Sequence, residues 1–142
     1  GILVADTGNR RVLFFGDGAA LAVVRAGITG TATNCAQDQR ARLTTPAALG
    51  EDEDGFLYVA DMGDHRVLRF ESESESGSVG TIVAGVGCKN SGSALSVLNS
   101  PAGIWVSPTR EVYVAEYGNH RLTRWAPGAS EGVLVAGTAQ RA

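Results

Sequence analysis

The segment Leu57-Tyr-Val-Ala-Asp-Met-Gly-Asp-His-Arg-Val67 decides the fold, because two close versions of it occur elsewhere in the chain. These versions are Ile2-Leu-Val-Ala-Asp-Thr-Gly-Asn-Arg-Arg-Val12 and Val112-Tyr-Val-Ala-Glu-Tyr-Gly-Asn-His-Arg-Leu122. Equivalent residues in successive copies are 55 positions apart, as are Pro46 and Pro101. A constant period of this length indicates a series of similar supersecondary units that pack against their neighbours.

Each unit is predicted to be an antiparallel meander of four short strands. In the second unit we expect strands near 47–50, 56–61, 66–71 and 81–84, separated by segments rich in Gly, Asp and Ser. Residues 56–60 are apolar in succession rather than in alternation, which indicates that both sides of the sheet are covered. The sheets should therefore lie between neighbouring sheets.

The three repeated strings, with a Pro upstream of the second and third and an Ala-Gly pair downstream of each, resemble the NHL-repeat family of β-propellers. The resemblance implies an all-β fold in which four-stranded blades pack face to face around an axis. It implies much less about activity, because members of this family bind proteins, carbohydrates or RNA and a few relatives are enzymes.

The chain holds about 2.6 units of 55 residues, whereas closed propellers carry about 4 to 8 blades. We therefore expect an incomplete ring, a segment of a longer protein whose remaining blades come from the same or another chain. The predicted boundaries are a partial blade at 1–27, an inter-blade loop at 28–45, a complete blade at 46–85, a loop at 86–100, a complete blade at 101–137 and the start of a further loop at 138–142.

A polar turn motif follows the second strand of each unit. Its members are Asp6, Asn9 and Arg11; Asp61, Asp64, His65 and Arg66; and Glu116, Asn119, His120 and Arg121. A carboxylate at a strand end can accept backbone N–H groups and pair with the Arg, while Gly and Asn suit the turn. Because a catalytic group is needed once and this motif recurs in every unit, we interpret it as structural.

Sorting the loops of a meander by the end at which they lie predicts one Arg-rich face and one acidic face. The candidate partner surface consists of Arg10, Arg40 and Arg42 on the first face and Glu71, Glu73 and Glu75 on the second. The run 71–76 alternates Glu with Ser and is expected to be an exposed, flexible loop. Trp105 and Trp125 fall in strands, and we expect both to pack between blades.

The sequence gives little support for a metal site, and no cofactor is expected. Asp52 and Asp54 resemble the spaced carboxylates of a calcium loop, but a solvated hairpin tip explains them as well. His65 and His120 occupy equivalent positions and would have to converge on the axis to serve a metal-dependent lyase. A lactonase-like site would need polar residues on the innermost strands, which 47–50 and 103–107 largely lack.

Composition narrows the class of partner. Acidic residues outnumber basic ones, 15 to 12, which argues against a nucleic-acid binder. The longest aliphatic run, 19–24, is too short to span a membrane. Two cysteines, Cys35 and Cys88, lie in corresponding loops where a disulfide is conceivable. High Gly and Ala content and a preference for Arg over Lys favour an extracellular or lumenal setting.

Together these observations predict a non-catalytic interaction scaffold that presents loops to a protein or carbohydrate partner. One alternative is a structural subunit, a homo-oligomer or an extracellular filament built by head-to-tail stacking of the two charged faces. The other is a metal-dependent lyase or lactonase-like enzyme.

Overall fold

The computed structural model describes residues 1–31 and 39–138, and in that part the chain forms three antiparallel sheets. The first sheet contains β1 (Ile2–Asp6), β2 (Arg11–Phe15) and β3 (Val23–Gly27). The second contains β4 (Pro46–Glu51), β5 (Leu57–Asp61), β6 (Arg66–Phe70) and β7 (Thr81–Gly85). The third contains β8 (Pro101–Val106), β9 (Val112–Glu116), β10 (Arg121–Trp125) and β11 (Val133–Gly137).

Each sheet is a meander in which strands pair in sequence order. The second and third sheets have four strands and the first has three, with β1 at its edge. The registers repeat as closely as the sequence does. A bulge after Val12 in β2 recurs after Val67 in β6 and after Leu122 in β10. The predicted all-β architecture of four-stranded antiparallel units is confirmed.

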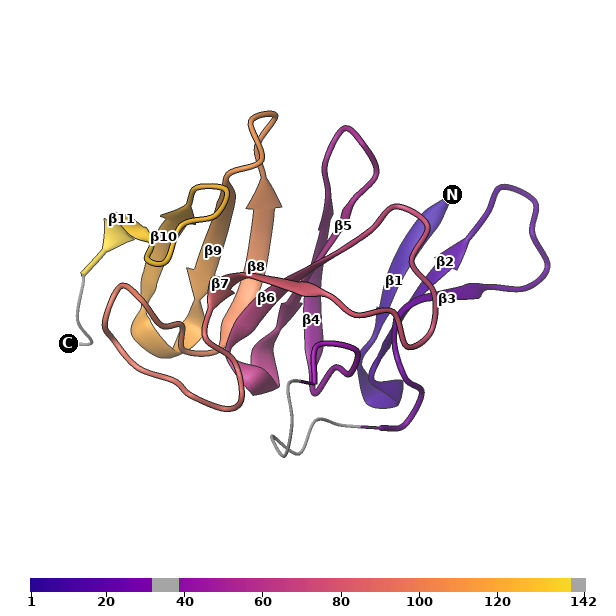
Figure 1. Cartoon of the computed structure of the whole chain (residues 1–142), viewed down its shortest axis with the longest axis horizontal. Helices are drawn as coiled ribbons and strands as arrows, with labels where there is room; N and C mark the ends of the chain where they lie inside the picture. Colours follow the sequence, from indigo (N-terminus) through magenta and orange to yellow (C-terminus); the bar gives the residue numbers. More distant parts are fainter. Residues whose placement is uncertain (32–38, 139–142) are drawn as a thin grey trace.

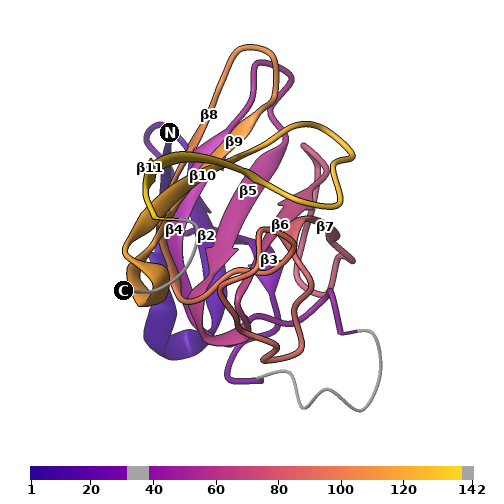
Figure 2. The ribbon, with the colours of Figure 1, turned by 90° about the vertical axis from the view of Figure 1, so that its left-hand side faces the viewer.

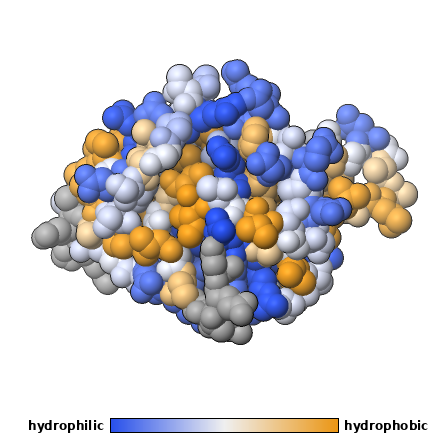
Figure 3. Space-filling view, viewed as in Figure 1, coloured by the Kyte–Doolittle hydropathy of each residue, from blue (hydrophilic) through white to orange (hydrophobic). Residues whose placement is uncertain are grey.

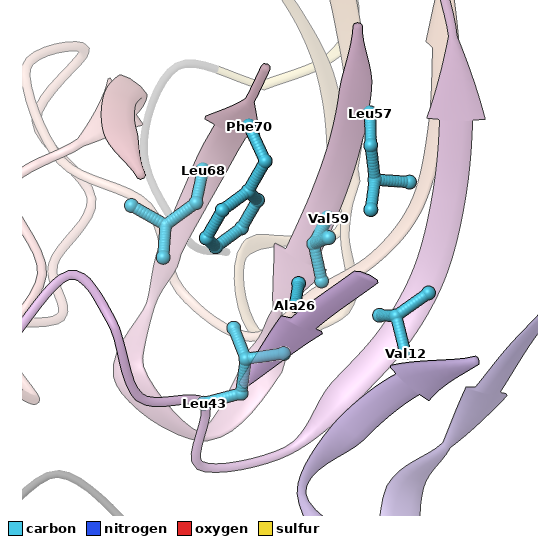
Figure 4. Packing of buried hydrophobic residues seen from close by; sticks show 7 residues of the cluster. All are labelled: Val12, Ala26, Leu43, Leu57, Val59, Leu68 and Phe70. Carbon is cyan, nitrogen blue, oxygen red and sulfur yellow. The ribbon is translucent and has the colours of Figure 1, made fainter. Parts of the chain in front are cut away.

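The three sheets lie side by side and bury apolar side chains between them (Figure 1). Between the first and second sheets, Val12 and Ala26 face Leu57, Val59, Leu68 and Phe70, with Leu43 beneath them (Figure 4). A second cluster joins the second and third sheets; its members are Tyr58, Val67, Ala84, Leu98, Val112, Val114 and Trp125. All five residues of β5 are buried, which explains the unbroken apolar run there.

The repeated polar motif forms a single 3₁₀ turn at the same end of every sheet. These turns are η1 (Thr7–Asn9), η2 (Met62–Asp64) and η3 (Tyr117–Asn119), drawn at the bottom of Figure 1. Each turn ends on a residue with positive φ: Arg10 at 59°, and His65 and His120 at 52°. The left-handed residue reverses the chain so that the next strand can begin.

The connection between β6 and β7, for which composition predicts an exposed, flexible loop, makes contacts with the first sheet. It crosses in front of the first sheet, as Figure 1 shows, and is bonded to it. Arg25 Nη2 donates to the carbonyl of Ser72 at 2.6 Å, and Gly77 N–H donates to the carbonyl of Gly27 at 3.2 Å. Ser74 is buried within this contact. Contacts between distant segments, which composition does not reveal, hold this connection in place.

Within residues 1–31 and 39–138 no helix is long and apolar enough to cross a membrane. Cys88 is disulfide-bonded, whereas Cys35 lies outside the described residues.

Candidate functional site

The turn of the second sheet holds three buried charged side chains, Asp61, Asp64 and Arg66. Asp61 Oδ1 accepts the backbone N–H groups of Thr44 and Thr45 at 2.9 and 2.8 Å. Arg66 Nε lies 3.3 Å from Asp61 Oδ2 and 3.1 Å from Asp64 Oδ2. Burial raises the pKa of Asp61, and the N–H of Thr45 and the charge of Arg66 oppose this rise.

This turn also fixes the loops that lie over it. Arg66 Nη2 donates to the carbonyl oxygens of Gln39 and Arg42, at 3.2 and 2.9 Å. Asp64 Oδ1 accepts the N–H of Lys89 at 2.7 Å. The charged cluster therefore binds the segment before β4 on one side and the segment after β7 on the other.

The third sheet repeats this arrangement with a longer acid. Glu116 Oε2 accepts from Arg121 Nε at 2.8 Å and from Thr123 Oγ1 at 2.9 Å, while Glu116 Oε1 accepts from Asn119 Nδ2 at 2.8 Å. The guanidinium of Arg121 donates to three loop carbonyls, those of Ser93, Ala94 and Val97. The longer Glu116 side chain thus pairs with the Arg that follows its turn as Asp61 does, and it also accepts from the side chains of Asn119 and Thr123.

The first sheet carries the same motif in a more open setting. Arg11 Nε lies 2.7 Å from Asp6 Oδ2, with the two side chains 27% and 24% exposed. Hydrogen bonds from Arg11 and Asn9 lower the pKa of Asp6. No loop carbonyl is bonded to Arg11 among the described residues; its second contact is Nη1 to Thr29 Oγ1 at 3.3 Å.

In the first and second turns, the left-handed residue reaches forward to the segment before the following sheet. Arg10 Nη1 donates to the carbonyl of Thr44 at 3.0 Å, and His65 Nδ1 accepts the N–H of Ser100 at 2.9 Å. Burial lowers the pKa of His65, although the nearby charges of Asp64 and Asp61 oppose this effect. His120 has the same backbone conformation but is exposed at the end of the stack. The structure therefore does not bring His65 and His120 together.

Most arginines of the Arg-rich face that loop sorting predicted are buried or make contacts within the chain. Arg66 and Arg121 are buried, and Arg11 is paired with Asp6. Arg10, Arg40 and Arg42 are each only partly exposed. Glu71, Glu73 and Glu75, in contrast, are all exposed on the β6–β7 connection. Of the predicted partner surface, the acidic half is the more accessible.

Asp52 and Asp54 face a cation rather than an open pocket. Asp52 Oδ1 accepts the N–H groups of Asp54 and Phe56, both at 3.0 Å. Asp52 Oδ2 lies 3.1 Å from the hydroxyl of Tyr58 and 3.5 Å from Arg110 Nε, and Arg110 also pairs with Asp54. The positive charge of Arg110 beside these two carboxylates disfavours the calcium loop that the sequence suggested for Asp52 and Asp54. No cluster of three or more His, Cys, Asp or Glu side chains suited to a metal occurs in the described part of the chain.

Two arginines with definite roles were missed in the sequence. Arg110 joins the β8–β9 turn to the β4–β5 turn, and its guanidinium lies 5.5 Å from the centre of the Phe56 ring. Arg25 binds the β6–β7 connection and lies 5.9 Å from the Phe14 ring. Neither belongs to the repeated motif, so no periodic signal could have revealed these contacts.

Trp125 and Trp105 differ in burial. Trp125 is buried between the second and third sheets, as expected. Trp105 is 58% exposed, because it lies on the side of the third sheet that no described segment covers, so its packing between blades stays a prediction.

Comparison with known proteins agrees with this geometry. A model of the NHL repeat family matches residues 98–125. A solved structure of regucalcin, a calcium-binding protein from Agrobacterium tumefaciens, superposes with a TM-score of 0.52 at 13% sequence identity. The match covers 93% of this chain and 37% of regucalcin. No curated protein matches the chain in sequence. The chain thus carries an NHL repeat, and its sheets are blades of the β-propeller type.

Proposed function

We propose that this chain is a non-catalytic interaction scaffold whose β6–β7 connection binds a basic protein partner. The observation that carries the proposal is an exposed acidic segment that is hydrogen-bonded to the rest of the chain. Its exposed side chains, Glu71, Glu73 and Glu75, alternate with serines, of which Ser74 is buried and Ser76 donates to the Gly27 carbonyl.

Four hydrogen bonds fix this segment. Besides the contacts of Ser72 and Gly77 already described, Ser76 Oγ donates to the Gly27 carbonyl at 3.3 Å and Gly80 N–H to the Arg40 carbonyl at 2.9 Å. A fixed backbone lowers the conformational entropy that binding would otherwise cost. Three carboxylates on such a backbone attract a cationic surface over distances of about a Debye length.

The polar turn clusters give independent support for a non-catalytic role. In the second and third sheets their charged groups are buried and bonded to backbone groups of the same chain. Groups engaged in this way stabilise loops and are not directed at a ligand. Regucalcin is a calcium-binding protein, but in this chain Arg110 occupies the space beside Asp52 and Asp54.

The test is binding of a short oligolysine peptide at low and high salt. The variant E71Q/E73Q/E75Q should bind at least about tenfold more weakly at low salt and lose most of the salt dependence. The matched control, E51Q/E53Q/E131Q, removes three other exposed carboxylates and should bind like the unmodified chain. Equal weakening in both variants would show non-specific attraction and would contradict the proposal.

A further inference from the structure

The β6–β7 connection and β3 depart from the repeat at the place where they meet. The connection contains ten residues, 71–80, whereas the equivalent connections of the first and third sheets contain seven. Arg25 in β3 stands where the other two sheets have Val83 and Val135, one position before the Ala-Gly pair. Figure 2 shows β3 and β7 to the right of β2 and β6, so the last strands of the first two sheets lie on the same side of the stack. Because the recurring features are structural, a specific contact is expected where the chain departs from them.

The two departures line a hollow of about 330 Å³ between the first sheet and the connection. Phe14 and Val23 belong to its apolar lining, and Glu73 and Glu75 supply two exposed carboxylates. In Figure 3 hydrophilic atoms lie beside a hydrophobic area at the right-hand end of the molecule, where β2 and β3 lie in Figure 1. The hollow carries net negative charge, because its two carboxylates outnumber the one guanidinium, that of Arg25.

Two polar groups of residues that line the hollow are unsatisfied. Ser74 is only 7% exposed, and its hydroxyl has no hydrogen-bond partner in the described ranges 1–31 and 39–138. The same holds for Arg25 Nε, although Nη2 of this side chain holds the connection through the carbonyl of Ser72. Buried polar groups without a partner cost free energy unless water or a ligand satisfies them. A ligand whose polar end reaches Ser74 would remove part of this cost.

We propose that this hollow binds one lysine side chain of the basic partner; the inference rests on the proposed function and names the side chain that the acidic segment recognises. The methylene groups of the lysine pack against Phe14 and Val23 while its ammonium pairs with Glu73 and Glu75, since long cationic side chains bury their stems along apolar surface. An ammonium has three donors, enough for both carboxylates and the Ser74 hydroxyl.

The aromatic part of the hollow favours lysine over arginine. A guanidinium binds best where it can stack on an aromatic face, whereas an ammonium acts as a compact point charge. The Phe14 ring already has a guanidinium near it, that of Arg25 at 5.9 Å from the ring centre. A second guanidinium on this ring would meet the like charge of the first, whereas an ammonium held at the two carboxylates does not need the ring.

Single glutamate variants test the hollow, with a short oligolysine peptide as the probe at low salt. E73Q and E71Q remove the same charge from the same segment, but only Glu73 lines the hollow. E73Q should weaken binding by at least about fivefold and E71Q by at most about twofold. A diffuse acidic surface predicts equal weakening, and that result would overturn the inference while leaving the proposed function intact.

Filling the hollow gives a second test that leaves every charge in place. Val23→Trp adds an indole at a 57% exposed lining residue and should weaken oligolysine binding by at least about fivefold. The control Val79→Trp makes the same change at a 63% exposed residue of the connection outside the hollow, and should bind like the unmodified chain. A peptide of diaminobutyric acid, which carries the same charge on a shorter stem, should be insensitive to Val23→Trp.

These outcomes separate the two proposals. If E71Q/E73Q/E75Q weakens oligolysine binding but Val23→Trp and Val79→Trp bind alike, the acidic surface stands and the lysine hollow is wrong. Equal sensitivity of the two peptides to Val23→Trp would also overturn the hollow. If the triple glutamate variant binds like the unmodified chain, the proposed function fails and this inference fails with it. Circular dichroism checks that all variants fold.

Discussion

The turns of the first and second sheets carry nearly the same residues in different surroundings. Asp6 and Arg11 form an ion pair that is about a quarter exposed, whereas Asp61 and Arg66 are buried beneath the loop before β4. The loop supplies two N–H donors to Asp61 and two carbonyl acceptors to Arg66. The comparison indicates that the motif is a clamp, by which we mean that its charged side chains hold a neighbouring loop in place. Its contribution to stability therefore depends on the loop that it holds.

The largest effect is expected for Asp61→Ala. The change leaves two backbone N–H groups without their acceptor and removes one of the two carboxylates beside the buried Arg66. We expect the free energy of unfolding, measured by urea denaturation, to fall by about 3 kcal/mol. Asp6→Ala is the matched control and should have a much smaller effect, because water can solvate Arg11. Equal losses would contradict the clamp.

A second contrast concerns the glycine of each turn. A Cβ on Gly63 would lie 2.5 Å from Thr45 Oγ1 and 2.7 Å from Thr44 Cγ2, whereas a Cβ on Gly8 would meet nothing within 4 Å. Gly63→Ala should therefore lower the free energy of unfolding by about 1–3 kcal/mol. Gly8→Ala should raise it by about 0.4–1 kcal/mol, through the lower entropy of the unfolded chain. Thermal unfolding of the two variants measures this difference, and the opposite order would contradict a loop packed on the second turn.

A smaller effect is expected in the pH dependence of stability, through His65. The folded pKa of His65 lies below its ordinary value of 6.5, so the unfolded chain binds the proton more readily. The contribution of His65 to stability is complete above pH 6.5 and is lost as the pH falls through the folded pKa. Asn tolerates positive φ, so His65→Asn should reduce the slope of stability against pH in this window. An unchanged slope in His65→Asn would contradict the lowered pKa of His65.

Much of the fold could be predicted because the sequence motifs that determine it recur with a constant period. Three strings in one phase indicated three sheets, and the apolar run 56–60 indicated a sheet covered on both sides. Strand ends deviate from the predicted ends by one residue, since β4 extends over Pro46–Glu51 and β7 ends at Gly85.

The candidate site was less predictable, because its contacts join segments that the repeat does not relate. The sequence indicates that an Arg ends each turn, but not that Arg66 and Arg121 point inward at loop carbonyls. It also does not indicate that Arg110 neutralises Asp52 and Asp54 from the next sheet. Trp105 lies in a strand, as expected, but no described segment covers its side of the third sheet.

Double-mutant cycles on the two acid–arginine pairs test the clamp most directly, because each cycle isolates the coupling within one pair. The variants Asp61→Ala, Arg66→Ala and their combination give the coupling in the second turn, and the same changes at Asp6 and Arg11 give that in the first. The account predicts a coupling free energy of about 1–3 kcal/mol for Asp61 and Arg66, and a much weaker coupling for Asp6 and Arg11. Couplings of equal size in the two turns would contradict it.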